Sequence, residues 1–203
     1  ITSTDFQRID VSKTAQWEIV FEHADKMGLF MHFKTQEQEN DQLLDGGALG
    51  LNRTLYYREL IARFGHHLAL NWNLGEETTN TEKELREFAD FIRATDPYDH
   101  PIVVHTWPSG KEDVYSPLLP TLDGASLQSR TQSVFNETLT WVQASAVNQK
   151  KWVVTNDEQN PQRDGVVPDH VDPDHDFIRQ NVLWGNIMAG GAGMSVANCV
   201  LPS

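Results

Sequence analysis

Segments with helical periodicity alternate along the chain with short apolar runs. Apolar residues recur at helical spacing in five segments, at residues 12–27, 54–64, 82–95, 133–149 and 176–189. Runs of strand length lie between them at residues 29–36, 67–74, 101–107, 124–129 and 151–158, with a last short one at 192–197. The first pattern predicts helices and the second predicts strands. Because apolar strands that alternate with helices form parallel sheets covered by those helices, the sequence predicts an α/β fold.

The ends of the predicted elements carry local signals. Ser12 stands at the N-cap position of the first helix, and Gly28 follows its last turn. Thr81 and Glu84 have the spacing of a capping box before the third helix. The segment 108–120 holds three prolines, so we expect a long loop there.

Two parallel architectures fit this alternation, an open doubly wound sheet and a closed eight-stranded barrel. An open sheet that binds a nucleotide has a glycine-rich turn after its first strand, and the glycines at 46–47 and 189–193 do not follow strands in that manner. A barrel instead carries functional polar residues at the carboxyl ends of several strands. Five predicted strands end in such residues: Gln36-Glu37, Glu76-Glu77, His105-Thr106-Trp107, Gln128-Ser129 and Asn156-Asp157-Glu158. Polar residues end many strands without a function, but their repetition over five strands favours a barrel with a site at its mouth.

Composition narrows the classes of function. The 203 residues carry a net charge of −13 and contain one Cys. We expect no nucleic-acid partner, because phosphate binding requires clusters of Lys and Arg that the sequence lacks. No apolar run reaches the length of about 18 residues that a membrane span needs. One Cys excludes an internal disulfide framework.

Two glutamates at strand ends suggest a chemistry. A retaining glycosidase uses two carboxyl groups about 5–5.5 Å apart, one as acid and base and one as nucleophile. Side chains from different strands of a barrel converge over its mouth, which makes Glu77 and Glu158 the natural pair. The alternative is that they are two unrelated surface glutamates, which their spacing alone does not exclude.

Several segments resemble a known family. The stretch LNWNLGEE (70–77) is similar to the fourth-strand segment of the clan A glycoside hydrolases, and WVVTNDE (152–158) is similar to their seventh strand. Three longer segments resemble bacterial barrel proteins of uncharacterised activity that are grouped with the glycoside hydrolases, often secreted and linked to polysaccharide use. These segments are residues 28–47, 55–77 and 183–193.

The resemblance implies roles for individual residues. Glu77 would be the acid and base, and Glu158 the nucleophile. Glu76 stands where the clan usually has an Asn that binds the 2-hydroxyl group of the sugar, and an ionised Glu accepts hydrogen bonds but cannot donate them. Either the contact to the substrate differs, or Glu76 itself is catalytic. We expect a polysaccharide or oligosaccharide substrate, no cofactor, and contacts to the sugar from residues near the strand ends: Gln36, Glu37, Asn73, His105, Trp107, Gln128 and His170.

The resemblance also implies an incomplete barrel. If residues 67–77 are its fourth strand, residues 1–203 form one partial (β/α)8 TIM-barrel domain in which strands 3–8 are present and strands 1–2 are missing. The chain does not begin with Met, and we expect it to be a piece of a longer, secreted or periplasmic enzyme with other domains.

Two other functions remain open. A degenerate barrel would be a non-catalytic carbohydrate-binding or scaffold protein, and the Glu at position 76 supports that alternative. The segment 168–176 packs four Asp and two His into nine residues, which suits a divalent cation and hence a metal-dependent hydrolase. The simpler interpretation of this segment is a solvated acidic loop that caps the next helix. His66 and His67 precede a strand, at the opposite end from the mouth, and are expected to be structural.

Overall fold

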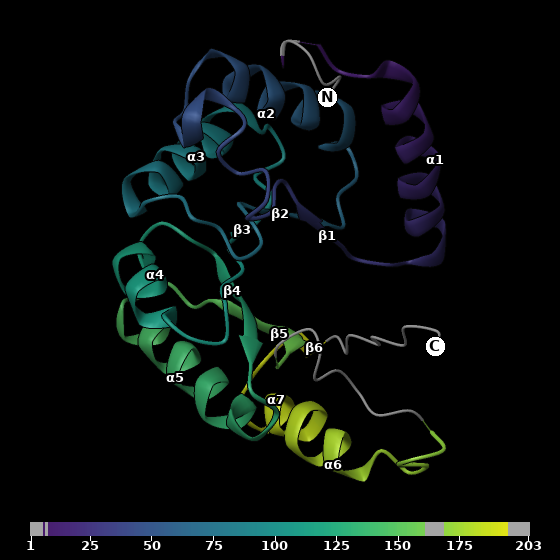
Figure 1. Cartoon of the computed structure of the whole chain (residues 1–203), viewed down its shortest axis with the longest axis vertical. Helices are drawn as coiled ribbons and strands as arrows, with labels where there is room; N and C mark the ends of the chain where they lie inside the picture. The colour runs from purple at the N-terminus through teal and green to yellow at the C-terminus, as the bar shows by residue number, and fades with distance from the viewer. Residues whose placement is uncertain (1–5, 7, 161–168, 195–203) are drawn as a thin grey trace. The chain divides into compact units, whose positions relative to one another are not determined.

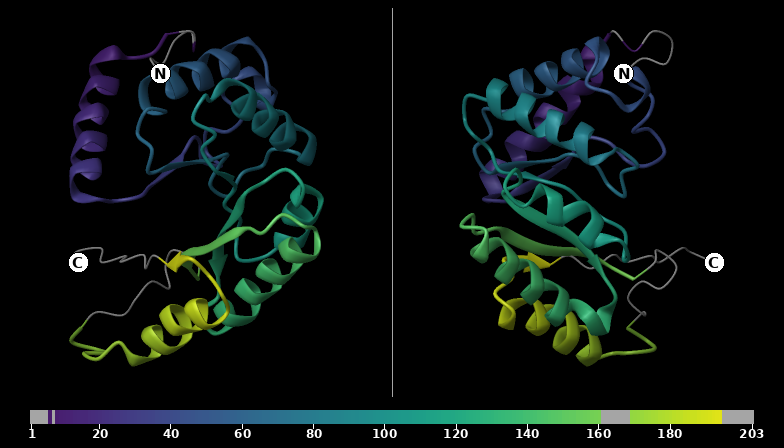
Figure 2. Two further views of the ribbon diagram at one scale, coloured as in Figure 1. Left: turned by 180° about the vertical axis from the view of Figure 1, so that it is seen from behind. Right: turned by 90° about the vertical axis from the view of Figure 1, so that its left-hand side faces the viewer.

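Helices and parallel strands alternate through the computed structural model, which describes residues 6, 8–160 and 169–194 (Figure 1, Figure 2). The chain divides into two compact units, Ile1–Val103 and Val104–Ser203, named here the N-terminal unit and the C-terminal unit. Each unit contains one three-stranded sheet with parallel neighbours. The predicted α/β class is therefore confirmed. Over the described residues the strands form these two small sheets and not a complete barrel.

The sheet of the N-terminal unit has the strand order β1-β2-β3. The elements of this unit are α1 (Val11–Met27), β1 (Met31–Lys34), the short 3-10 helix η1 (Asp45–Gly47), α2 (Leu51–Phe64), β2 (Leu70–Asn73), α3 (Glu82–Thr95) and β3 (Ile102–Val103). Met31 pairs with Leu70, and this register continues to Lys34 and Asn73. Because side chains alternate across a strand, Phe33 and its partner lie on one face, while His32 and Lys34 lie on the other.

The helices of this unit cover the apolar face of the sheet. Phe33 and Trp72 pack with their ring centroids 5.4 Å apart. Phe33 also contacts Phe21 of α1 at 5.5 Å and Phe64 of α2 at 5.7 Å. Asp96 accepts hydrogen bonds from Trp72 Nε1 at 2.9 Å and from the backbone N–H of residue 98 at 3.0 Å. This apolar layer leaves the opposite face of the strands to polar residues.

The sheet of the C-terminal unit has the strand order β4-β5-β6. The elements of this unit are α4 (Lys111–Leu118), β4 (Gly124–Ser129), the 3-10 helix η2 (Thr131–Ser133), α5 (Val134–Val147), β5 (Val153–Gln159), α6 (Asp176–Ile178), the π-helical η4 (Arg179–Trp184), α7 (Gly185–Met188) and β6 (Gly193–Met194). Tyr115, Trp141 and Trp152 form an aromatic cluster with centroid distances between 4.9 and 6.2 Å. The remainder of the predicted strand 192–197 lies outside the described residues. In neither unit does a described helix have the length and apolar character needed to cross a membrane.

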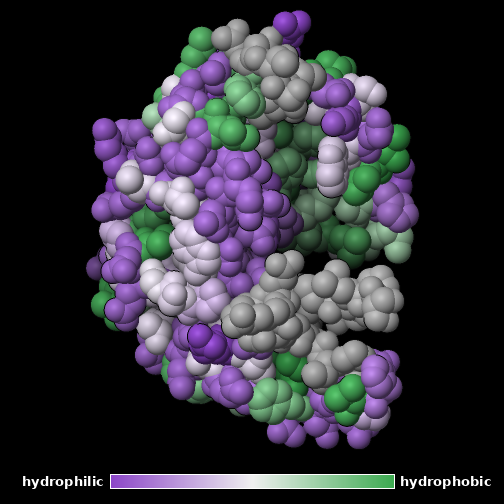
Figure 3. All heavy atoms as spheres, in the orientation of Figure 1, coloured by the Kyte–Doolittle hydropathy of each residue, from purple (hydrophilic) through white to green (hydrophobic). Residues whose placement is uncertain are grey.

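Helix α1 buries only part of its predicted apolar stripe. Phe21 and Ala24 are buried, whereas Trp17, Val20 and Met27 have 59%, 52% and 62% of their surface exposed. A recess of about 520 Å³ lies between this helix and the sheet, lined by Trp17, Val20 and Phe21 among other residues. Figure 3 shows it as a hollowed, mainly hydrophobic surface beside α1. The sheet ends there at β1, whose residues are all half-buried.

Two local predictions were wrong. Asp10, and not Ser12, caps α1, because its carboxylate accepts from the backbone N–H of Lys13 at 3.1 Å. The proline-rich segment forms α4 instead of a loop, with Pro117 inside the helix. Tyr115 of this helix is fully buried, so packing against the sheet outweighs the low helix propensity of the proline. Gly28 at the end of α1 and the capping box of α3 are confirmed.

Candidate active site

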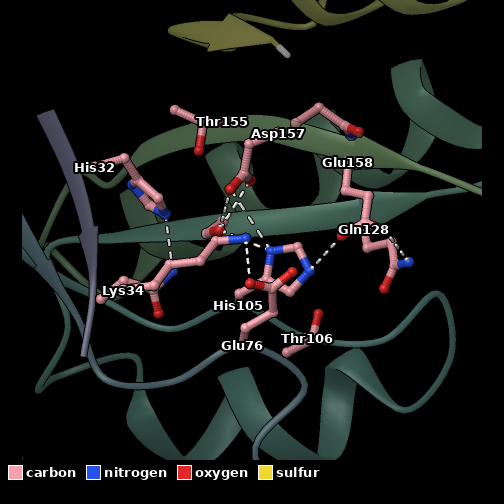
Figure 4. A network of polar contacts seen from close by, with 12 residues as sticks. His32, Lys34, Glu76, His105, Thr106, Gln128, Thr155, Asp157 and Glu158 are labelled. Carbon is pink, nitrogen blue, oxygen red and sulfur yellow. Dashed lines mark hydrogen bonds and ion pairs between the residues drawn. The ribbon is translucent and has the colours of Figure 1, made fainter. Parts of the chain in front are cut away.

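A polar cluster lies on one face of the sheet in the C-terminal unit (Figure 4). We define the C-terminal polar cluster as His105, Ser126, Gln128, Asp157 and Glu158. Ser126 Oγ donates to the Asp157 carboxylate, whose oxygens lie 2.8 and 2.7 Å away. His105 Nδ1 lies 3.0 Å from Ser126 Oγ, and His105 Nε2 lies 3.5 Å from Glu158 Oε2. The buried imidazole therefore stands between two carboxylates of the same strand.

The carboxylate of Glu158 is oriented and still accessible. Gln128 Nε2 donates to Glu158 Oε1 at 2.9 Å and to the backbone oxygen of Asn160 at 3.0 Å. The Glu158 side chain is 18% exposed, whereas that of His105 is fully buried. A nucleophilic carboxylate needs a fixed direction and an open side, and Glu158 has both.

An irregularity in the strand pairing places the two carboxylates together. Leu127 pairs with Asn156, but the next residue, Gln128, pairs with Glu158. Asp157 is therefore an extra residue in β5, as in a β-bulge. In a regular strand, neighbours such as Asp157 and Glu158 point to opposite faces. The bulge allows both to reach the C-terminal polar cluster.

A buried tyrosine fixes the backbone behind His105. Tyr115 Oη lies 3.0 Å from the backbone oxygen of Val104 and 2.9 Å from that of Ser126. His105 itself forms a parallel bridge with Ser126. Burial raises the pKa of Tyr115 above its ordinary value, so the phenol remains a neutral hydrogen-bond donor at all working pH values. This contact holds the His105 backbone beside β4.

The N-terminal unit carries a second polar group at the ends of β1 and β2. Lys34 Nζ lies 2.8 Å from Glu76 Oε2, and both side chains are slightly more than a quarter exposed. The backbone of Glu76 continues the strand pairing, because its N–H donates to the oxygen of Gln36 and its own oxygen accepts from Gln38, both at 3.0 Å. Figure 4 shows the Lys34 and Glu76 side chains meeting. The Glu76 side chain is thus engaged by the ammonium group of Lys34.

The amides of Asn73 and Gln36 are used inside the chain. Asn73 Nδ2 lies 2.8 Å from His32 Nε2, and its Oδ1 accepts from the backbone N–H of Gly75 at 3.1 Å. Gln36 Nε2 donates to Asn80 Oδ1 at 2.7 Å, and its Oε1 accepts from the buried Arg53. Both side chains are almost fully buried. Contact of either amide with a sugar stays a prediction.

Glu77 adopts an unusual backbone conformation. Its φ angle of 48° lies in the left-handed region, which a residue with a Cβ atom rarely adopts. Such a conformation costs about 1–3 kcal/mol, and six other described non-glycine residues share it. The Glu77 side chain is half-buried. The residue before it, Glu76, forms an isolated parallel β-bridge with Glu37, whose side chain is exposed.

The remaining predicted site residues do not join these groups. Trp107 is half-buried, and His170 is exposed. In the described part of the acidic loop, His175 Nε2 lies 2.9 Å from Asp169 Oδ1, and the hydrogen bond from His175 lowers the pKa of Asp169. Over residues 169–176 no third His, Asp or Glu group lies within ligand range of this pair.

Ser126, Asp157 and Lys34 belong to the polar groups but were not among the predicted site residues. Asp157 and Ser126 each had a weak signal in the sequence. Asp157 directly precedes Glu158, and Ser126 lies two residues before Gln128, so both side chains point to the same face of the predicted strand. The alternation of side chains along a regular strand predicts that Asp157 and Glu158 lie on opposite faces, because the bulge arises from the pairing with β4 and leaves no mark in the sequence.

Comparisons with known proteins support a glycosidase-like fold. No protein-family model matches the sequence, and no curated protein does. The solved structures that resemble the chain include a family 2 glycosyl hydrolase from Bacteroides cellulosilyticus DSM 14838, with a TM-score of 0.55 and 15% identity over 87% of this chain. A family 5 mannosidase from Rhizomucor miehei gives a TM-score of 0.61 and 8% identity over 94% of the chain. A β-glucuronidase from Ruminococcus gnavus gives a TM-score of 0.53 and 10% identity over 91%.

These structures confirm the resemblance to glycoside hydrolases at the level of the fold. The chain covers only 21%, 65% and 37% of the three proteins, in the same order. At such low identities the likeness concerns the α/β arrangement of a part of a glycosidase barrel. It leaves the activity to be argued from this chain's own residues.

Proposed function

We propose that this chain carries catalytic residues of a glycoside hydrolase that cleaves a polysaccharide or oligosaccharide by a retaining mechanism. The C-terminal polar cluster supports this proposal most directly. Glu158 is directed by Gln128, flanked by His105 and partly exposed, as a nucleophile requires. Glu158 would attack the anomeric carbon while a second carboxyl group protonates the leaving oxygen. Water then releases the sugar from the glycosyl–enzyme ester, and the second group takes up the proton.

We assign the acid and base role to Glu77 and not to Glu76. The Glu76 carboxylate is engaged by the Lys34 ammonium group at 2.8 Å, whereas a catalytic acid must present its carboxyl group to the leaving oxygen. Glu77 lies at a left-handed position four residues after the end of β2. The retaining mechanism requires the carboxyl groups of Glu77 and Glu158 to come within about 5–5.5 Å.

Substitution of the two glutamates tests the proposal. We expect Glu158→Gln and Glu77→Gln each to lower kcat at least about 100-fold on an aryl glycoside that wild type cleaves, because each removes a step of the chemistry. Proton NMR of the first product should show the substrate's anomeric configuration. Azide should restore cleavage to Glu158→Ala, since a small anion can take the place of the lost carboxylate.

Matched controls lie on the helices of each unit. Glu87→Gln on α3 and Glu112→Gln on α4 remove one carboxylate outside the strand ends and should leave kcat unchanged. If Glu158→Gln keeps wild-type turnover, or if the first product is inverted, the retaining mechanism with this nucleophile is wrong.

The ion pair at position 76 favours a second candidate, a carbohydrate-binding protein without catalysis. Lys34 forms a salt bridge with the carboxylate of Glu76. At this position the clan usually has an Asn that binds the 2-hydroxyl group of the sugar. Such a protein would bind oligosaccharides, measured by calorimetry, without releasing reducing ends. Glu158→Gln would then change the affinity for oligosaccharides, and neither protein would cleave them.

We propose that the described strands β1–β6 are strands 3–8 of a (β/α)8 barrel. They are parallel and follow one another in chain order within each sheet. The apolar recess beside α1 and β1 supports the absence of further strands at this edge, because a complete barrel would cover it. We also propose a secreted or periplasmic location, where a polysaccharide substrate would be met, and fractionation of source cells tests it.

A further inference from the structure

A second group of polar residues lies away from the strand ends. Glu18 is on α1, and His66 and His67 are in the turn that leads from α2 to β2. These residues are at the amino end of β2, whereas the candidate active site uses carboxyl ends. We call Glu18, His66 and His67 the Glu18–histidine cluster.

The three side chains converge on one carboxylate oxygen. His66 Nε2 lies 3.1 Å and His67 Nε2 lies 3.2 Å from the same atom, Glu18 Oε1. All three atoms lie within 4.8 Å of one another. The centroids of the two imidazole rings lie 4.0 Å apart with an angle of 37° between the ring planes, and each ring turns its Nε2 toward Glu18.

Each ring nitrogen of His67 faces a carboxylate oxygen. Its Nδ1 lies 2.6 Å from Asp25 Oδ2, while its Nε2 faces Glu18. When Nδ1 donates its N–H to Asp25, Nε2 of a neutral imidazole carries a lone pair that can bind a metal ion. The His67 side chain is only 1% exposed, so its neighbours hold the ring in this orientation.

We propose that the Glu18–histidine cluster binds a divalent transition-metal ion, best matched by Zn²⁺. Two imidazole nitrogens and one carboxylate oxygen are a ligand set that Zn²⁺ favours. Bonds of about 2.0–2.2 Å place two tetrahedral ligand atoms about 3.3 Å apart, close to the separations of 3.1 and 3.2 Å. His66 is 53% exposed, so the ion can reach the site and a water can complete its coordination.

Asp25 orients one ligand of this site. Its carboxylate accepts the Nδ1 proton of His67 and fixes the tautomer in which Nε2 carries the lone pair. The metal ion would join α1 to the turn before β2 and would stabilise the N-terminal unit. This proposal is independent of the proposed glycosidase, because none of the four residues takes part in it.

Titration of the intact chain with Zn²⁺, after treatment with a chelator, tests the site. Glu18 and His66 lie at the surface, so Glu18→Gln and His66→Gln should fold like wild type, which far-UV circular dichroism checks. We expect each to weaken the binding of one Zn²⁺ at least about 10-fold, and Asp25→Asn to weaken it about 10-fold. Zn²⁺ at 100 times its Kd should raise the wild-type Tm by about 5 °C or more, and the variants should lose this shift.

The controls use the same helix. His23→Gln and Glu22→Gln remove a histidine and a glutamate of α1 outside the cluster and should bind Zn²⁺ like wild type. Co²⁺ bound to wild type should give the visible absorption of a tetrahedral site, which Glu18→Gln should reduce. No binding by wild type at 100 µM Zn²⁺, or equal affinity in wild type, Glu18→Gln and His66→Gln, overturns the proposal.

Discussion

At the scale of single residues, Asp96 joins the end of α3 to the segment before β3. Its side chain is 1% exposed and lies 2.6 Å from His100 Nδ1, in addition to the hydrogen bonds from Trp72 and the residue 98 backbone. Burial by itself raises the pKa of Asp96, but these hydrogen bonds and the charge of His100 outweigh it and hold the pKa below its ordinary value. We expect Asp96→Asn to lower the free energy of unfolding at pH 7 by about 2–3 kcal/mol, because one acceptor oxygen becomes an NH2 group that faces buried N–H donors.

The lowered pKa also sets the pH dependence of this effect. The contribution of Asp96 is complete above the unfolded-state pKa of about 3.9 and is lost as the pH falls through the lower pKa of the folded state. In urea unfolding between pH 7 and pH 2.5, the difference between wild type and Asp96→Asn should therefore shrink below about pH 4. Asp99→Asn, whose side chain is 79% exposed, is the control and should stay within about 0.5 kcal/mol of wild type. A constant difference down to the lowest pH would contradict this account.

At the scale of elements, α3 shows how far local signals determine a helix. Thr81 Oγ1 accepts from the backbone N–H of Glu84 at 3.3 Å, and the Glu84 carboxylate accepts from the N–H of Thr81 at 2.7 Å. We expect Thr81→Ala to lower the free energy of unfolding by about 1 kcal/mol, measured in urea. Thr95→Ala, in the last turn of the same helix, is the matched control and should have little effect. An equal loss in both variants would mean that the capping box adds nothing.

The sequence predicted most elements but not the details of the site. Helix α3 and strand β4 have the predicted bounds, because their signals are local. Helix α4 was missed because the burial of Tyr115 and Leu118 stabilises a helix that Pro117 alone would disfavour. Gln128 and Glu158 were predicted separately, but their contact depends on the pairing of β4 with β5, which no local pattern contains. The pairing of Lys34 with Glu76 was beyond prediction for the same reason.

At the scale of the whole molecule, the apolar recess beside α1 distinguishes this chain from a closed barrel. We expect Nile red to bind it, because Val20 and its neighbours present an uncovered hydrophobic surface. A neutral dye avoids the repulsion that a net charge of −13 exerts on anionic dyes. Val20→Ser should lower the dye fluorescence, whereas Val147→Ser, an equally small change at an 84% exposed position of α5, should not. Equal fluorescence of Val20→Ser and wild type would show that the recess is not the binding surface.

The β-bulge at Asp157 has a consequence for how such a site is gained or lost in evolution. Removal of the codon for Asp157 would leave β5 a regular strand, in which Glu158 follows Asn156 and stays opposite Gln128. Ser126 would then lose its carboxylate partner, while Gln128 and the residues before the bulge would keep theirs. An in-frame deletion of three nucleotides would thus remove one carboxylate from the C-terminal polar cluster and leave the other in register. Among homologous sequences, the length of this strand would then show whether the cluster has one carboxylate or two.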